Sequence, residues 1–473
     1  MNRLLLALLL LLPACPSGND DDSATDDSGD DDTGDDDDTG DDDDVTPLPA
    51  GSFDVQVPSS AGGPEGIAVR VWHPGEDATR YGDGAPITVS VPGGWGVNML
   101  SDAASEPDGV PQGMVVVEFL LPGFTTPEGS SGGTYDFRGP ACRRALADVV
   151  RYAGGDLADT DGTTLMERVP FADADNLGVV GRSNGGNLAL TALAEHAAEL
   201  PPVHWLVAWE SPVGDQFAAI ELNDNDFYVP GTCTATTCPT PGLDAALVWD
   251  ATGITRHNDA MNQLQELTGA LCVDADGGGT CDAGELRFAG AVSEEGPGLF
   301  RLHPSVELSA AIAARGPALF GGAPPPWLAT EAQAATYWNG RDGALAVPAL
   351  AAAFPALGII HVQKQTDHVQ TQPDHPHASA HLQAWIDAGH AFVRLNADAV
   401  YVGDAAGVDP SLVNELDANA PVPWPGVADV LPDAEIAGVS TAPFVTSAAM
   451  SELADRTRVG DWSVDLDALL PRD

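Results

Sequence analysis

Runs of apolar residues divide much of the chain into segments with the periodicity of strands and helices. Residues 52–57 and 67–72 alternate apolar and polar positions, a pattern typical of strands that bury one face. Residues 114–121 form a continuous apolar run, which is typical of a strand inside a parallel sheet. The pattern therefore predicts two antiparallel edge strands that lead into a mostly parallel sheet.

Helical periodicity alternates with the later strands. We expect further strands at 87–91, 203–209, 355–362 and 390–395 and helices at 138–152, 188–199 and 448–458. Alternation of strand and helix favours a doubly wound α/β sheet, in which ligands bind at the carboxyl ends of the strands.

One turn between a strand pattern and a helix pattern carries candidate chemistry. The apolar run 176–180 is followed by Gly181-Arg-Ser183-Asn-Gly185 and then by the helix-like run 187–194. This is the G-x-S-x-G arrangement, in which a serine is held on a sharp turn from strand to helix. Small residues are needed beside the serine because a Cβ would clash there, and the helix N-terminus offers unpaired N–H groups to an anion. Ser183 is thus the candidate nucleophile.

In these features, over about residues 52–215 and 346–402, the chain resembles the α/β-hydrolase superfamily. The loop after the third strand, Val91-Pro-Gly-Gly-Trp-Gly96, stands where esterases and peptidases of the family carry an H-G-G-type loop, with proline in place of the histidine. The resemblance implies that backbone N–H groups near Gly94 or Trp95, and that of Asn184, stabilise a tetrahedral oxyanion. It also implies cleavage of an ester or peptide bond through an acyl-enzyme.

The same resemblance implies an acid and a histidine later in the chain. Asp367, in a turn after the predicted strand 355–362, is similar to the family's orienting carboxylate, and Asp215, after the sixth strand, is the alternative. The family's histidine follows the last strand, yet the last histidine of this chain is His390. His375 or His377 would then have to serve as the general base.

The histidine-rich stretch around these residues has two other interpretations. It is either a solvated polar loop or a transition-metal site, because imidazole and carboxylate are common ligands. The metal interpretation would use Asp367, His368, Asp374, His375 and His377. Their spacing copies no zinc pattern, which favours the base and then the plain loop.

Regular alternation is lost between about residues 213 and 345, where hydrolases of this superfamily carry a cap or lid. Inside it, the stretch 274–285 has the spacing of an EF-hand calcium loop, with a glycine at position 6. The predicted ligands are Asp274, Asp276, Gly278, Thr280 (through its carbonyl), Asp282 and Glu285. Gly278 at position 5 lacks a side-chain ligand, which predicts weaker binding. Met261, Leu264, Leu267 and Leu271 have the spacing of an entering helix.

The amino-terminal residues resemble a bacterial lipoprotein signal. A basic start and an apolar run lead into Leu12-Pro-Ala-Cys15, so residues 1–15 are predicted to be a signal peptide and Cys15 to carry a lipid; an ordinary signal peptide is the alternative. Residues 16–50 are rich in Asp, Gly, Ser and Thr and predict a disordered acidic tether. We expect an exported protein on the outer membrane or the cell surface.

Charge and cysteines complete the prediction. The formal net charge of −52 argues against nucleic acid as a partner, since phosphate binding needs Lys and Arg. Export permits disulfides, which we expect at Cys233–Cys238 and Cys272–Cys281, with Cys142 buried and unpaired.

The expected layout is a hydrolase core at 51–215 and 346–473 around a cap at 216–345. The leading hypothesis is a surface-anchored serine hydrolase that acts on a small ester or a peptide, with calcium stabilising the cap. The alternative is a hydrolase-fold binding protein without catalytic activity, which the missing late histidine favours.

Overall fold

The computed structural model describes residues 47–94, 100–101, 106–211, 242–258, 264–274, 277–281, 291–296, 299–362, 376–390, 392–395, 442–460 and 462. The chain divides into two units, residues 1–46 and 47–473. The predicted signal peptide, Cys15 and most of the predicted tether fall in the first unit, outside the described residues, so they stay predictions. In the described part, no helix combines the length and the apolar character that crossing a membrane requires.

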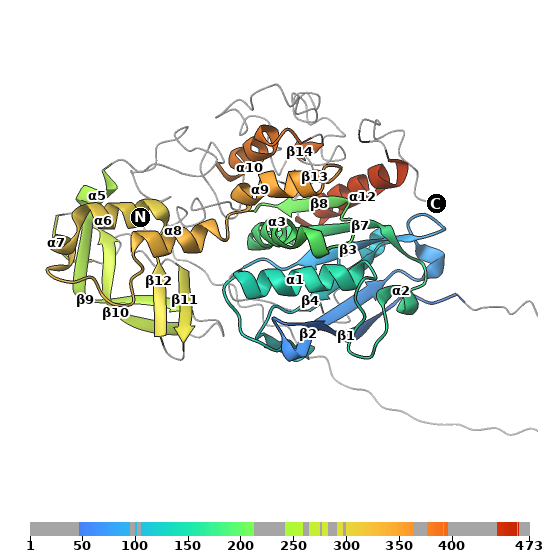
Figure 1. Cartoon of the computed structure of the whole chain (residues 1–473), viewed down its shortest axis with the longest axis horizontal. Coiled ribbons are helices and arrows are strands. Elements are labelled where there is room, and N and C mark those ends of the chain that lie inside the picture. The colour runs from blue at the N-terminus through green and yellow to red at the C-terminus, as the bar shows by residue number, and fades with distance from the viewer. Residues whose placement is uncertain are drawn as a thin grey trace, which may run out of the picture. The chain divides into compact units, whose positions relative to one another are not determined.

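An eight-stranded sheet organises the larger part of the second unit (Figure 1). Its strands are β1 (Gly51–Ser59), β2 (Gly63–His73), β3 (Ala85–Val91), β4 (Val115–Phe119), β7 (Ala172–Arg182), β8 (Trp205–Trp209), β13 (Gly358–Val362) and β14 (Val393–Leu395). They lie in the order β1-β2-β4-β3-β7-β8-β13-β14. β2 is antiparallel to both of its neighbours and the remaining pairs are parallel. This arrangement is the α/β-hydrolase fold, which confirms the predicted class.

Helices cover both faces of this sheet. They are α1 (Pro140–Ala153), α2 (Leu165–Arg168), α3 (Asn184–His196), α9 (Gly343–Ala353), α10 (Pro376–Asp387) and α12 (Ala442–Val459). Figure 1 shows α1 and α3 side by side, and α3 also contacts α9. Two close contacts show which face each helix covers. A Cβ on Gly186 of α3 would lie 3.6 Å from the Ala208 side chain of β8, so α3 covers the face to which Ala208 points. A Cβ on Gly358 of β13 would lie 3.1 Å from Leu453 of α12, and Gly358 pairs with Trp205, three residues before Ala208; since side chains alternate along a strand, α12 covers the opposite face.

The C-terminal helix α12 is held to the sheet by buried ion pairs. Arg80 donates to Asp455 of α12 at 2.6 Å, and the two side chains are each 8 % exposed. Glu452 of α12 accepts hydrogen bonds from Arg394 of β14 and, at 2.9 Å, from Arg456. Glu452, Arg394 and Arg456 therefore join α12 to β14 of the sheet.

The insertion between β8 and β13 forms elements of its own. They are α5 (Leu243–Ala246), β9 (Leu247–Asn258), β10 (Leu264–Val273), β11 (Ala291–Gly296), β12 (Leu299–His303), α6 (Val306–Arg315), α7 (Pro317–Phe320) and α8 (Glu331–Asn339). β9 pairs with β10 and β11 with β12, both antiparallel. A separate apolar cluster includes Leu247, Leu271 and Leu308. The insertion therefore has its own small core, which the loss of regular alternation in the sequence did not reveal.

Short elements complete the described part. A two-stranded hairpin, β5 (Thr125–Thr126) with β6 (Gly129–Ser130), follows β4, and single 3₁₀ turns lie at Glu76–Ala78, Val110–Gln112 and Ala197–Glu199. Cys142 is fully buried in α1 and unpaired, as predicted, and burial raises the pKa of its thiol.

Candidate active site

Ser183 occupies a strained turn between β7 and α3. β7 ends at Arg182, α3 begins at Asn184, and Ser183 has φ 51° and ψ −124°. A non-glycine residue in this region costs on the order of 1–3 kcal/mol and persists where the surrounding structure enforces it. Here the Ser183 N–H donates to the Trp209 carbonyl at 2.8 Å, and its carbonyl accepts from the Gly186 N–H at 2.9 Å. Ser183 is partly exposed, so its side chain is positioned at the surface of the sheet's carboxyl edge.

The glycines around Ser183 are required by close contacts. A Cβ on Gly181 would lie 2.5 Å from the Gly186 Cα, and one on Gly185 would lie 2.4 Å from the Val91 carbonyl oxygen. A Cβ on Gly186 would lie 1.8 Å from the Ser211 Oγ. Since real Cβ atoms do not approach so closely, alanine at any of the three would force the backbone to move. The turn thus has the packing that the G-x-S-x-G pattern predicts.

The loop after β3 lies directly against this turn. A Cβ on Gly93 would lie 2.8 Å from the Arg182 carbonyl oxygen and 3.3 Å from the Ser183 Cβ. Gly94 has φ 71°, and its carbonyl accepts from the Asn184 side-chain amide at 3.3 Å. As the first residue of α3, Asn184 has a backbone N–H with no acceptor inside the helix. Gly94 and Asn184 are therefore brought together beside Ser183, and Trp95 lies outside the described residues.

Neither carboxylate that the sequence suggested lies in the described part: Asp367 falls in 363–375 and Asp215 in 212–241. The structure instead brings a third acid to this edge. Glu210 follows β8 directly, its backbone N–H donates to the Val362 carbonyl at 2.8 Å, and its side chain is fully buried. Its φ of 38° is also strained. Sequence reasoning missed Glu210, although a glutamate directly after the apolar run 205–209 was a usable signal.

The candidate histidines separate into two groups. His375 lies outside the described residues, whereas His377 is the second residue of α10. A crossover helix between two parallel strands starts at their carboxyl edge, so the start of α10 is at the same edge of the sheet as Ser183. His390 is at the opposite edge, since its Nε2 lies 2.5 Å from the Leu357 carbonyl, which precedes β13. The length of that strand, about 16 Å at 3.3 Å a residue, excludes His390 as the base for Ser183.

A buried histidine pair lies between β13 and α10. His361 and His381 are fully buried, with ring centroids 4.5 Å apart. Burial lowers the pKa of His361 to about 3. In the unfolded chain a histidine titrates near its ordinary pKa of about 6.5. Between that pH and about pH 3, His361 therefore binds a proton in the unfolded state but not in the folded state.

This pair predicts an acid-sensitive fold. The free energy of unfolding should be independent of His361 above about pH 6.5 and should fall by up to about 1.4 kcal/mol per pH unit as the pH drops from there toward 3. Urea titrations of the wild type and of His361→Leu at several pH values measure this. A parallel pH dependence in both proteins would contradict the assignment.

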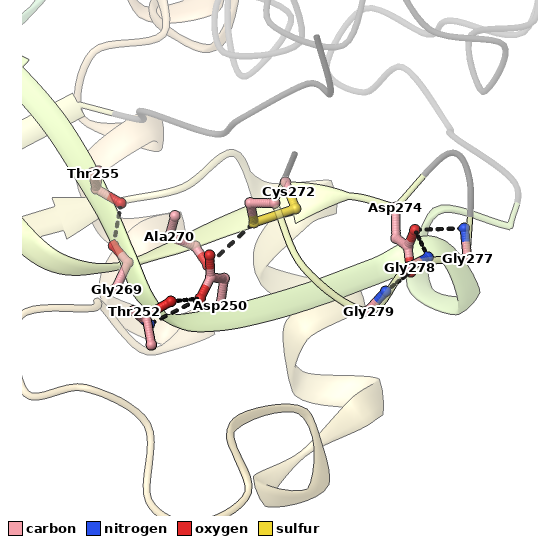
Figure 2. Close-up of a disulfide and its surroundings, with 11 residues drawn as sticks. Asp250, Thr252, Thr255, Gly269, Ala270, Cys272, Asp274, Gly277, Gly278 and Gly279 are labelled. Carbon is pink, nitrogen blue, oxygen red and sulfur yellow. Dashed lines mark hydrogen bonds between the residues drawn. A yellow bond between two sulfur atoms is a disulfide. The ribbon is translucent and has the colours of Figure 1, made fainter. Parts of the chain in front are cut away.

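The predicted calcium loop follows a strand, not a helix (Figure 2). Leu264–Val273 is β10, so the helix expected from Met261, Leu264, Leu267 and Leu271 is wrong in that range. The residues 268–269, threonine and glycine, disfavour a helix, and pairing with β9 satisfies the backbone instead. The predicted disulfide Cys272–Cys281 is confirmed, while Cys233 and Cys238 lie outside the described residues.

Asp274 organises the first half of this loop. Figure 2 shows its Oδ1 accepting from the N–H groups of Gly277 at 2.7 Å and Gly278 at 3.0 Å, and its Oδ2 accepting from that of Gly279 at 3.0 Å. Gly277 and Gly279 have φ 77° and 78°, so the chain wraps around the carboxylate. That curvature fits a cation loop with Asp274 at position 1. Thr280 is described too, whereas Asp276, Asp282 and Glu285 fall outside the described residues; within them no group of three metal-binding side chains forms.

Comparison with known proteins gives structural neighbours alone. No protein-family model matches the chain, and no curated protein matches it. A bacterial heroin esterase is similar over 38 % of this chain and 50 % of its own length, with 18 % identity and a TM-score of 0.27. An esterase of Pyrobaculum calidifontis is similar over 34 % and 46 %, with 22 % identity and a TM-score of 0.25. A prolyl endopeptidase is similar over 35 % and 22 %, with 20 % identity and a TM-score of 0.24. The chain thus matches about half the length of these esterases.

Proposed function

We propose that this protein is a serine hydrolase that cleaves an ester or peptide bond through an acyl-enzyme on Ser183. The observation that carries the proposal is the geometry at position 183: a partly exposed serine at positive φ, between a strand and a helix, with Gly93 packed against it. Strain of this kind is typical of functional sites and has no evident use in a plain turn.

The proposed reaction follows from that geometry. The Ser183 oxygen attacks the substrate carbonyl carbon while a histidine, His375 or His377, takes the hydroxyl proton. The carbonyl oxygen becomes an oxyanion, which the N–H groups near Gly94 and that of Asn184 stabilise. The proton then passes to the leaving alcohol or amine as the bond breaks, and water releases the acyl group by the same steps in reverse. Small esters and short peptides are the proposed substrates.

A carboxylate would orient the histidine, and two candidates remain. Asp367 is the residue that the sequence predicts, and Glu210 is the one that the structure brings next to the end of β13. Comparing the activities of Asp367→Asn and Glu210→Gln assigns the role, since removing the orienting carboxylate of a triad costs on the order of 10⁴ in kcat.

Covalent labelling tests the proposal. A fluorophosphonate should react with Ser183, forming a bond from the serine oxygen to phosphorus and expelling fluoride, and mass spectrometry should locate the adduct. The rival hypothesis of an inactive binding protein is favoured by the absence of any histidine after His390 in the sequence. Wild-type protein that takes up no phosphonate would support the rival.

We also propose that the loop at 274–285 binds calcium as a structural ion, with Asp274, Asp276, Asp282 and Glu285 as side-chain ligands. The turn around Asp274 supports this. Loops of the weak, extracellular type dissociate in the range of about 10⁻⁴ to 10⁻³ M. At about 1 mM calcium the gain in unfolding free energy should then be about 0.4–1.4 kcal/mol.

Urea denaturation of the wild type with calcium and with a chelator measures this gain. Glu285→Gln should abolish the calcium effect without lowering stability in the chelator. Asp274 is unsuitable for the test, because its carboxylate also holds three backbone N–H groups. Equal calcium effects in the wild type and Glu285→Gln would contradict the ligand assignment.

A further inference from the structure

Arg138 is a buried residue in a strained conformation just before α1. It is 4 % exposed and has φ 65°, directly after Phe137 with φ 54°. Two successive side-chain-bearing residues at positive φ together cost on the order of 2–6 kcal/mol, so the surrounding structure must enforce this turn. Part of that support is visible: the carbonyls of Asp136 and Phe137 accept hydrogen bonds from Arg341 at 2.8 and 2.7 Å.

The guanidinium of Arg138 holds the loop beside Ser183. Its Nη2 donates to the Gly93 carbonyl at 2.7 Å and to the Gly94 carbonyl at 2.9 Å. In a trans peptide unit the carbonyl points opposite to the N–H of the following residue. Fixing the Gly93 carbonyl toward Arg138 therefore fixes the Gly94 N–H away from it. The Gly94 N–H is one of the amides proposed to face the oxyanion.

The charge of Arg138 is not neutralised in the described part of the chain. Its Nε and Nη1 are buried without a hydrogen-bond partner there, and no carboxylate of the described residues lies within 4.0 Å of its nitrogens. The other arginines buried in that part each pair with a carboxylate: Arg80 with Asp455, Arg143 with Glu195, and Arg394 and Arg456 with Glu452. A buried charge without such a partner lowers stability by several kcal/mol.

We propose that Arg138 is a positioning residue of the oxyanion hole. It orients the Gly94 amide in the loop after β3 and supplies a fixed positive charge behind it, which stabilises the negative charge that develops on the substrate oxygen. This inference rests on the proposed serine hydrolase activity. It explains why the fold keeps a strained, buried cation that has no carboxylate partner in the described part of the chain, instead of an apolar side chain, at this position.

The test separates catalysis from stability. Arg138→Met, Arg138→Lys and the control Arg143→Met are compared with the wild type for the thermal midpoint and for kcat and KM on p-nitrophenyl acetate. We expect Arg138→Met to lower kcat about 10- to 100-fold, less than loss of a direct oxyanion donor, with KM within about twofold. Its thermal midpoint should stay the same or rise. Arg138→Lys should recover part of kcat, because it keeps the charge.

The control inverts this pattern. Arg143 is buried and donates to Glu195 and, at 2.7 Å, to the Gly340 carbonyl, so Arg143→Met should lower the thermal midpoint and leave kcat per folded molecule unchanged. Loss of stability with unchanged kcat in Arg138→Met, or a lysine variant no better than methionine, would overturn the positioning role. A wild type that neither hydrolyses the ester nor takes up the phosphonate would overturn the proposed function, and this inference with it.

Discussion

Ser183→Ala should reduce kcat for ester hydrolysis by a factor on the order of 10⁴–10⁶, the scale seen when the nucleophile of a serine hydrolase is removed. The reason is the loss of the covalent route: alanine leaves the oxyanion donors in place but offers no oxygen to attack the carbonyl. The measurement is steady-state hydrolysis of p-nitrophenyl esters, with the thermal midpoint recorded on the same preparations. The midpoint should not fall, since the variant removes one partly exposed oxygen from a strained turn.

Ser211→Ala is the matched control. Ser211 is fully buried just beyond β8, its Oγ donates to the Trp209 carbonyl at 3.3 Å, and it lies against Gly186 of the same turn. Its loss should leave kcat within about threefold, because a buried hydroxyl that bonds to the backbone contributes about 1 kcal/mol to stability and nothing to attack. If both serine variants kept wild-type activity, the esterase activity would belong to another site or another protein.

The succession of core strands and helices along the chain and the position of Ser183 could be predicted because both depend on residues that are close in the sequence. The run 176–180, the glycines of the turn and the helix-like run 187–194 lie within 20 residues, so neighbouring positions alone specify a strand, a turn and a helix. The doubly wound, mostly parallel sheet was predicted from the alternation of strands and helices and from the family resemblance, whereas the order of its eight strands comes from the structure. The structure adds the contacts that explain the glycines, such as Gly185 against Val91.

Features that depend on distant contacts could not be predicted. The role proposed for Arg138 depends on its contacts with Gly93 and Gly94, which lie 45 and 44 residues earlier in the chain, and on the absence of a carboxylate partner among the described residues. In β10, apolar residues at helical spacing were misleading, since pairing with β9 and the disulfide to Cys281 decide the conformation. Local periodicity cannot weigh such partners.

The carboxylate of Glu452 predicts the largest effect on stability. It is 2 % exposed and accepts hydrogen bonds from Arg394, which is 10 % exposed, and from Arg456, which is 1 % exposed. Glu452→Gln removes the negative charge that these two buried cations share while nearly keeping the side-chain shape. Breaking a buried ion pair by changing one partner costs about 3–5 kcal/mol, because the remaining charge is left in a medium that solvates it poorly. Urea denaturation near pH 7 measures the loss.

Glu195→Gln is the comparison variant: it also removes a carboxylate that pairs with arginine, but from an exposed side chain, so it shows how much of the loss of unfolding free energy in Glu452→Gln is due to burial. Glu195 also bonds to a buried arginine, Arg143, but its own side chain is 44 % exposed, so this ion pair reaches the surface. Arg143 keeps its hydrogen bond to the Gly340 carbonyl at 2.7 Å, and we expect a smaller loss there than in Glu452→Gln. Arg394 belongs to β14 and Glu452 to α12, so the contrast tests whether this buried ion pair holds α12 to the sheet. Equal losses in the two variants would mean that α12 is held by its apolar contacts, such as that of Leu453 at Gly358, and not by the buried charges.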